Sequence, residues 1–252
     1  MIEALVNRFM LGRKRRLAVC REPGVLLDVG CGRGAFLASM QQAGWQVAGV
    51  EFNDETAAYA RDVYGVTVTT GLALPDASFD VITINHVLEH IAAPAQTIQA
   101  CYRLLKKGGL LVVAVPNIRS LQATVGKSAW LHLDVPYHLV HFSEEGLSKL
   151  LQMNGFSINR IRRFDLEQNP FGWLQTLLNL AGIRANLLYN LLKNPVLRKA
   201  ELANATVGDI LLTFILLPFF APLSLLLALL EAFLLKRGGT IELWGEKVTG
   251  TD

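Results

Sequence analysis

Three glycines alternate with other residues directly after a short apolar run, in the stretch Val25–Leu37, which reads VLLDVGCGRGAFL. An apolar run, a cluster of glycines and a second apolar segment predict a strand, a tight turn and a helix. Gly30, Gly32 and Gly34 have no Cβ atom, so a ligand can lie against the backbone at the N-terminal end of the helix. The stretch therefore predicts a binding site for a molecule of nucleotide size.

Two acidic residues accompany this turn. Asp28 lies two positions before the first glycine, and Glu51 lies near the end of a second apolar strand, Gln46–Phe52. A carboxylate at the tip of the second strand is placed to accept hydrogen bonds from ribose hydroxyls. A nicotinamide-binding turn needs a further glycine where this chain has Ala35, and an acid before the first glycine is not part of that fingerprint. A dehydrogenase is therefore the less favoured alternative.

Histidines follow two later strands that should end at the same edge of the sheet. The first of these strands is 79–85, and the second is 110–115, which leads into an extended segment. Histidine is the side chain most easily tuned to accept a proton near neutral pH. The candidates for a general base at this edge are His86, His138 and His141. The commoner role for the last two is that of hydrogen-bonded loop histidines.

The spacing His86-x-x-Glu89-His90 also resembles a metal cluster. A simpler interpretation is that Glu89 and His90 cap and position a loop. We favour the simpler interpretation and predict no metal site.

Predicted strands and helices alternate along the first part of the chain. Helices are expected over 34–42, 53–64, 94–107 and 143–154, and further strands over 66–70, 79–85, 110–115, 156–166 and 240–248. This rhythm predicts a doubly wound α/β fold, with helices on both faces of a parallel sheet and ligands at the carboxyl ends of its strands.

Composition limits the class of protein. The chain has 252 residues and a net charge of +3, which gives no reason to expect nucleic acid as a partner. Cys20, Cys31 and Cys101 are odd in number and scattered, without C-x-x-C spacing. They predict small buried thiols in a reducing, cytosolic setting, and they disfavour a disulfide framework or a zinc site.

The motifs DVGCGRG and VAGVEF resemble the first two motifs of class I S-adenosylmethionine-dependent methyltransferases. The stretch 71–94, GLALPDASFDVITINHVLEHIAAP, is similar to the third and fourth motifs of the ubiquinone-biosynthesis type. The resemblance implies a seven-stranded Rossmann-like sheet and methyl transfer from S-adenosylmethionine to a small-molecule acceptor, with O-methylation favoured. The cofactor-binding residues that it implies are Asp28, Gly30, Cys31, Gly32, Gly34, Glu51, Phe52, Leu72, Ala73 and Asn85.

At Leu72 the chain departs from the family pattern, and at Phe52 a second role is open. Relatives often carry an acid that holds the adenine amino group where this chain has Leu72, so that contact must come from the backbone or be absent. Phe52 would pack on the adenine plane, although an ordinary core position is equally consistent with its type. The segment from Trp130 to Phe142 resembles the family pattern W-x-x-x-x-x-P-x-H-x-x-H-F, which implies part of the substrate pocket or a lid over it.

About seventy residues separate the sixth and seventh predicted strands, which are adjacent and antiparallel in the family. Leu174–Leu192 has helical amphipathic periodicity, and Ile210–Leu235 is almost wholly apolar. Pro218 and Pro222 interrupt the apolar run, so we expect a bent or re-entrant hairpin in one membrane leaflet. It would present a hydrophobic or lipid-linked acceptor to the enzyme. Packing on the domain or on a second subunit is the alternative.

Four parts make up the predicted chain: an N-terminal basic helix at 1–23, a cofactor-binding core at 24–170, a hydrophobic helical insertion at 171–238 and a final core strand with a tail at 239–252. The basic run Arg13–Arg16 and the insertion predict a cytoplasmic protein, peripheral or monotopic on the inner face of a membrane. The pattern leaves the oligomeric state open. A catalytically idle, membrane-associated adaptor is the remaining alternative, and the intact Asp28, Gly30, Gly32 and Glu51 speak against it.

Overall fold

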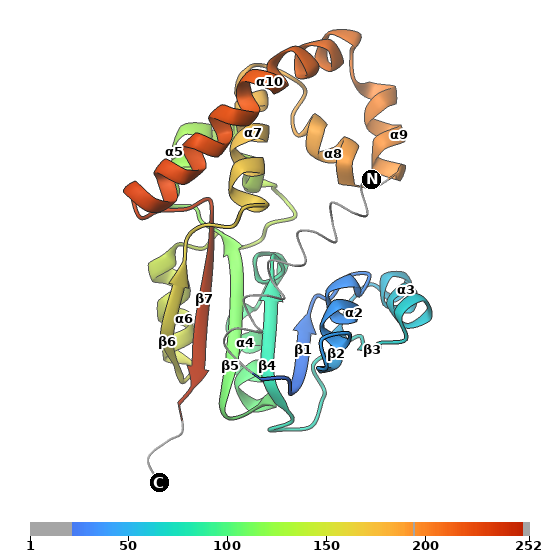
Figure 1. Ribbon diagram of the computed structural model, residues 1–252, viewed down its shortest axis with the longest axis vertical. Coiled ribbons are helices and arrows are strands. Elements are labelled where there is room, and N and C mark those ends of the chain that lie inside the picture. The colour runs from blue at the N-terminus through green and yellow to red at the C-terminus, as the bar shows by residue number, and fades with distance from the viewer. Residues whose placement is uncertain (1–21, 194, 249–252) are drawn as a thin grey trace. The chain divides into compact units, whose positions relative to one another are not determined.

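The computed structural model describes residues 22–193 and 195–248 (Figure 1). The chain divides into two compact units. The first comprises Met1–Val115, Glu145–Ile161 and Glu242–Asp252, and the second comprises Pro116–Glu144 and Arg162–Ile241. The predicted basic helix at the N-terminus lies outside the described residues, as does Cys20.

A seven-stranded sheet forms the centre of the first unit, in the order β3-β2-β1-β4-β5-β7-β6. The pairs β1–β2, β1–β4, β2–β3 and β4–β5 are parallel. Figure 1 shows β7 running against its neighbours, which makes the sheet mixed. The strands are β1 (Val25–Val29), β2 (Gln46–Val50), β3 (Thr67–Thr69), β4 (Phe79–Asn85), β5 (Leu105–Pro116), β6 (Phe156–Arg162) and β7 (Thr240–Lys247). The predicted Rossmann-like sheet is confirmed.

Helices between the strands complete this unit. They are α2 (Ala35–Gln41), α3 (Asp54–Tyr64), α4 (Pro94–Leu104), α6 (Glu144–Met153) and a 3-10 turn η1 (Leu88–His90). Asn53 caps the N-terminus of α3, because the backbone amide of Thr56 donates to Asn53 Oδ1 at 2.8 Å. Gly65 ends this helix with a φ of 64°. Cys31 and Cys101 are buried free thiols, as expected, and Cys31 lies in the cluster that packs β1 and β4 against α2 and α3.

The helix predicted over 94–107 is shorter in the structure, so its predicted C-terminal end was wrong. Helix α4 ends at Leu104 and β5 begins at Leu105, which pairs with Phe79 at the start of β4. The extended backbone lets the ammonium group of Lys106 reach the Asp80 carboxylate at 2.8 Å. Lys106 and Lys107, the last two residues of the predicted helix, therefore belong to strand β5.

The second unit is mainly helical. Its helices are α5 (Leu121–Gly126), α7 (Gln168–Leu180), α8 (Leu187–Lys193), α9 (Pro195–Asn204) and α10 (Val207–Leu229), with 3-10 turns at Lys127–Ala129 and Leu131–Leu133. The single amphipathic helix predicted over Leu174–Leu192 was wrong. The chain leaves the helix after Leu180, because Gly182 and Asn186 adopt left-handed φ values of 81° and 56°. Leu178, Ile183 and Leu187 pack together across this break.

The apolar stretch forms one long helix, so the predicted hairpin was also wrong. Helix α10 continues through Pro218 and Pro222 and passes into a π-helical turn at Leu230–Leu234. A proline removes one backbone hydrogen bond, and the surrounding run of leucines, which are good helix formers, continues the helix. Thr206 and Asp209 form a reciprocal capping box at its start. Figure 1 shows α10 packed along α7.

Candidate active site

The three glycines after β1 have different structural roles. A Cβ atom on Gly30 would lie 2.2 Å from the side chain of Val87, and one on Gly34 would lie 2.9 Å from that of Ala60 on α3. A Cβ atom on Gly32 would meet no atom within 4 Å. Gly30 and Gly34 are therefore required for packing, whereas Gly32 is the glycine that leaves the backbone open to a ligand.

Glu51 lies just after β2 and contacts this turn directly. Its Oε2 accepts a hydrogen bond from the amide of Gly32 at 2.9 Å, and its Oε1 accepts one from the amide of Asn53 at 3.0 Å. A carboxylate can accept about four hydrogen bonds, so these two leave capacity for further donors such as vicinal hydroxyls. The glycine turn and the acid at the end of the second strand are therefore in direct contact.

Asp28 is buried within the sheet, with 3% of its surface exposed. Its Oδ1 accepts a hydrogen bond from the hydroxyl of Thr83 on the adjacent strand β4 at 2.5 Å. No local sequence pattern indicates Thr83, because only the register of β1 against β4 places it opposite Asp28. Asp28 therefore anchors the base of the turn.

The electrostatic environment of the turn is negative. Burial raises the pKa of the Cys31 thiol to about 12, and the charges of Asp28 and Glu51 add to this shift. The thiol consequently stays protonated and neutral at physiological pH. The same two carboxylates favour a ligand that carries positive charge.

Phe52 follows Glu51 and is 56% exposed, so the alternative of an ordinary core residue is wrong. Its ring is available to a planar ligand. Leu72 and Ala73 follow β3, and the carbonyl of Leu72 accepts a hydrogen bond from Arg103 at 3.0 Å. The backbone in this region is thus held in place by Arg103.

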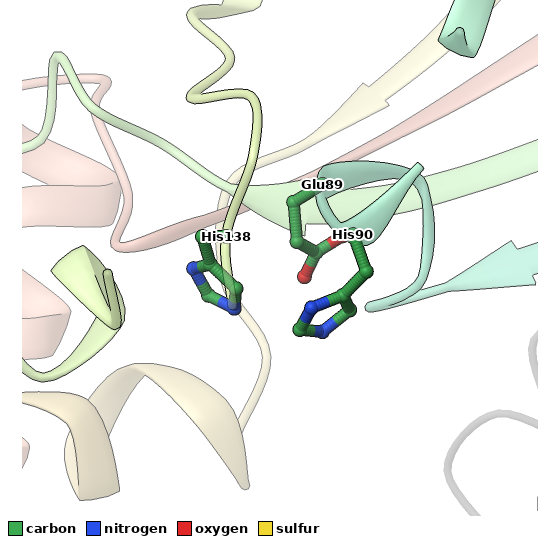
Figure 2. Close-up of side chains that lie close together, drawn as sticks. All are labelled: Glu89, His90 and His138. Atoms are coloured by element: carbon green, nitrogen blue, oxygen red, sulfur yellow. The ribbon is translucent and has the colours of Figure 1, made fainter. Parts of the chain in front are cut away.

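His86 directly follows Asn85, the last residue of β4, and has a left-handed φ of 54°. Its amide donates to the carbonyl of Ala114 on β5, and its Nδ1 lies 3.5 Å from a carboxylate oxygen of Glu89. Glu89 is 2% exposed, whereas His90 is exposed. Figure 2 shows Glu89 and His90 together on the turn after β4.

His138, also drawn in Figure 2, and His141 belong to the second unit. The Nδ1 of His138 lies 2.8 Å from the carbonyl oxygen of His132, and the Nε2 of His141 lies 3.0 Å from that of Leu133. Because a carbonyl only accepts, each of these nitrogens carries the hydrogen. The other ring nitrogen of each neutral histidine, Nε2 of His138 and Nδ1 of His141, is then the one that can accept a proton.

Residues 2–160 match the family model described as a methyltransferase domain. This chain belongs to the methyltransferase domain family. S-adenosylmethionine is its cofactor, and the turn fits it: Gly32 leaves open backbone, Glu51 has free acceptor capacity and the local charge is negative. The sulfonium and ammonium groups of S-adenosylmethionine are positive, in agreement with that field.

Two curated relatives support the family assignment. The chain is 31% identical over 138 residues to a probable S-adenosylmethionine-dependent methyltransferase of Mycolicibacterium smegmatis, with 53% of this chain and 52% of that protein covered. It thus spans about half the length of that relative. It is 27% identical over 189 residues to the ubiquinone biosynthesis O-methyltransferase of Pseudomonas paraeruginosa, with 71% and 72% covered.

The fold of the methyltransferase domain is also similar to solved structures. A SAM-dependent methyltransferase from Archaeoglobus fulgidus superposes with a TM-score of 0.59 at 20% sequence identity, covering 96% of this chain and 94% of that one. At this identity the similarity shows the fold alone.

Proposed function

We propose that this methyltransferase transfers the methyl group of S-adenosylmethionine to an oxygen atom of a hydrophobic or lipid-linked small molecule. The observation that carries the proposal is the exposed apolar helix α10 in a chain with a cofactor turn of this family. The similarity to an O-methyltransferase of ubiquinone biosynthesis supports oxygen as the acceptor atom.

The cofactor, when bound, supplies a methyl group on a positively charged sulfur. Glu51 would accept hydrogen bonds from the ribose hydroxyls, and the exposed ring of Phe52 would pack on the adenine. Gly32 would allow the cofactor to approach the backbone, with Cys31 as a neutral neighbour in the same turn. Asp28 would hold the turn in place through Thr83.

Transfer to a hydroxyl group requires that the hydroxyl loses its proton. His86, His138 and His141 are the proposed bases, and one of them would accept that proton. His86 follows the strand next to the cofactor turn, and its contact with Glu89 would stabilise the protonated imidazole. His138 has a similar arrangement, because its Nε2 lies 4.0 Å from a carboxylate oxygen of Asp134.

Membrane contact is the second part of the proposal. The helical stretch Val207–Leu234 has 28 residues. Its most apolar 18-residue window has a mean hydropathy of 2.5, and only 11% of that window is buried. The exposed phenylalanines at positions 214, 219 and 233 are each at least 67% exposed. Water disfavours so large an apolar surface, whereas a lipid leaflet accommodates it.

The connections favour a helix that lies in one leaflet over one that crosses the membrane. A 28-residue helix is about 42 Å long, enough to span the ~30 Å hydrocarbon core. However, the insertion leaves β6 and returns to β7, which is next to it in the sheet. Among the described residues, no other helix has the length and hydropathy to cross back. Exposed Lys236 and Arg237 follow the helix and would contact anionic headgroups at the cytoplasmic face.

Flotation with vesicles tests the membrane contact. The full chain should float with phosphatidylglycerol vesicles, and replacing Phe214, Phe219 and Phe233 by Ser should reduce the bound fraction at least about tenfold. The matched control replaces three exposed apolar residues of the first unit, Val63, Tyr64 and Met153, by Ser and should float like the wild type. Wild-type protein that stays with the soluble fraction would contradict the proposal.

Product identification tests the reaction. The protein is incubated with methyl-labelled S-adenosylmethionine and a lipid extract, and the labelled product is characterised. We expect the label on an oxygen of an extractable, hydrophobic compound. Label on nitrogen or carbon, or label that remains in the aqueous phase, would contradict the proposed acceptor.

A further inference from the structure

The second unit contains a cavity of about 400 Å³, and Asp134, which lies beside His138, is one of its lining residues. Every residue that lines it belongs to that unit, between the turns after α5 and the break between α7 and α8. Its volume lies in the range of small-molecule sites. The lining residues are Ser128, Ala129, Trp130, Leu133, Asp134, Val135, Asn179, Ala185 and Asn186.

One wall of the cavity is fixed by amide hydrogen bonds. The Nδ2 of Asn179 donates to the carbonyl of Ala129 and to Asn186 Oδ1, each at 2.9 Å. Its Oδ1 accepts from the amide of Asn186 at 2.9 Å and from Gln175 Nε2 at 2.8 Å. Asn179 thus uses all of its hydrogen-bonding capacity to hold the wall in place.

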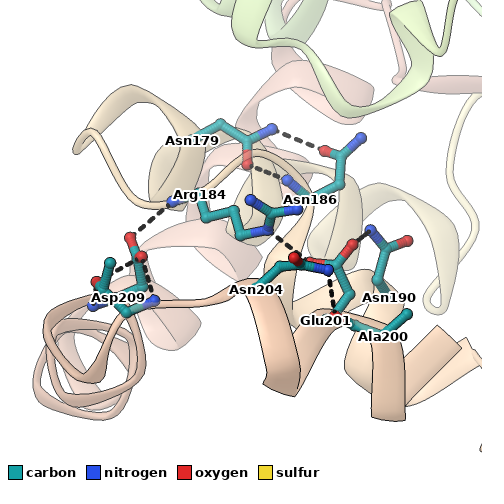
Figure 3. A network of polar contacts seen from close by, with 9 residues as sticks. Asn179, Arg184, Asn186, Asn190, Ala200, Glu201, Asn204 and Asp209 are labelled. Carbon is teal, nitrogen blue, oxygen red and sulfur yellow. Dashed lines mark hydrogen bonds and ion pairs between the residues drawn. The ribbon is translucent and has the colours of Figure 1, made fainter.

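Asn186 is held by this network but keeps its side-chain amide nitrogen as a donor group for a ligand. Its Oδ1 is used by Asn179, and Figure 3 shows its amide nitrogen directed away from Asn179. Within the described part of the chain, neither this nitrogen nor the hydroxyl of Ser128 makes a hydrogen bond. A left-handed φ of 56° presents Asn186 at the break between the helices.

The aromatic wall is anchored from inside the unit. The Nε1 of Trp130 donates to Gln122 Oε1 at 2.9 Å, and Gln122 is fully buried. The backbone amide of Gln122 donates to a carboxylate oxygen of Glu231, just after α10. Trp130 is therefore held in a fixed orientation, as a preformed ligand site requires.

The polar groups of the cavity differ in hydrogen-bonding type. The Asp134 carboxylate only accepts, the Asn186 amide nitrogen only donates, and the Ser128 hydroxyl does both. A ligand hydroxyl can pair with all three, because it both donates and accepts. Five of the nine lining residues are apolar and suit the C–H surface of a ring.

We propose that this cavity binds a neutral, hydroxyl-rich ring such as one monosaccharide unit. In the membrane-bound protein that unit would be the headgroup of a glycolipid, since the same unit exposes the apolar helix α10. The glycolipid step rests on the proposed membrane contact. Binding of a free sugar requires neither the membrane contact nor methyl transfer.

Saturation-transfer NMR on the full chain in a sugar-free detergent tests the site. The probes are the methyl glycosides of glucose, mannose and galactose, with tetramethylammonium as a cationic comparison. We expect saturable binding of at least one glycoside and about tenfold weaker binding after Asn186→Asp, which keeps the shape and the acceptor but removes the donor. Asp134→Asn should weaken binding to a similar extent.

Asn204→Asp is the matched control. Asn204 also lies in the second unit and appears in Figure 3. Its side-chain Nδ2 donates to the carbonyl of Ala200, and it is not among the residues that line the cavity. This variant should bind glycosides like the wild type. The proposal is overturned if none of the glycosides shows saturable binding. It is also overturned if tetramethylammonium binds instead and its binding depends on Asp134. A glycoside that binds while the protein fails to float with vesicles would refute only the glycolipid step.

Discussion

The backbone amide of Gly32 donates to Glu51 Oε2 at 2.9 Å, so the open glycine of the turn and the acid at the end of β2 are directly bonded. Glu51 therefore has two roles, since it fixes the conformation of the turn and offers its remaining lone pairs to the cofactor. A change at Glu51 should alter both the turn and the affinity for the cofactor.

Glu51→Ala should weaken S-adenosylmethionine binding by about tenfold or more. The ribose hydroxyls lose a charged acceptor, a loss of about 1.5 to 3 kcal/mol. Calorimetry with S-adenosylhomocysteine measures the change. Glu55→Ala, at an exposed position in the first turn of α3, is the control and should bind normally. Unchanged affinity in a folded Glu51→Ala variant would reject the ribose assignment.

Alanine substitutions at Gly30 and Gly32 should differ in their effects. The first should mainly lower protein stability, and the second should mainly impair cofactor binding. Gly30→Ala places a Cβ atom 2.2 Å from Val87 and should lower the unfolding free energy by about 3 kcal/mol, with partial recovery in the double variant with Val87→Ala. Gly32→Ala has open space and should cost only about 1 kcal/mol from its left-handed φ, yet it should impair cofactor binding. Thermal unfolding and calorimetry on both variants check this. Equal loss of stability in the two would contradict the distinction.

Loss of the proposed base should affect turnover without affecting the cofactor. Among His86→Ala, His138→Ala and His141→Ala, at least one variant should lose about two orders of magnitude in kcat while it binds S-adenosylhomocysteine normally. Turnover on the identified acceptor and calorimetry supply the two measurements. Full activity in all three variants would exclude a histidine base and favour transfer driven by proximity alone.

Glu231 should matter for the stability of the second unit. It is fully buried, and its carboxylate accepts hydrogen bonds from Trp173 Nε1 at 2.8 Å and from the amide of Leu121 at 2.5 Å. Glu231→Ala leaves these donors without an acceptor and should lower the unfolding free energy by about 3 kcal/mol, measured by thermal unfolding. A change below about 0.5 kcal/mol would contradict this role.

The pH dependence of the same residue has a definite sign. Burial raises the pKa of Glu231, so its contribution to stability is fully present below the pKa of the unfolded chain and declines as pH rises through the folded value. The stability of the wild type relative to Glu231→Gln should therefore be greatest in acid and fall toward neutral pH. A difference that grows with pH would show that the hydrogen bonds outweigh burial.

The sequence by itself determined the features that depend on neighbouring residues. The glycine turn, the helix over 53–64 and strand β4 were all predicted, because turn chemistry and apolar periodicity are local properties of the chain. The order of strands and helices in the sheet-containing part followed from the same patterns. The cofactor class followed from the resemblance of the motifs DVGCGRG and VAGVEF to a known family. Glu51 could be assigned to the turn because parallel strands end at one edge of a sheet.

Only the tertiary structure decided features that depend on contacts between distant residues. The hydrogen bond between Thr83 and Asp28 depends on strand register, and that between Leu121 and Glu231 joins residues about a hundred positions apart in the sequence. No local pattern indicates either pair. For the same reason, the end of helix α7 at Leu180 was not predicted, and the apolar stretch was wrongly expected to bend at its two prolines. Apolar periodicity shows which face of a segment must be covered, whereas the partner that covers it decides where the helix ends.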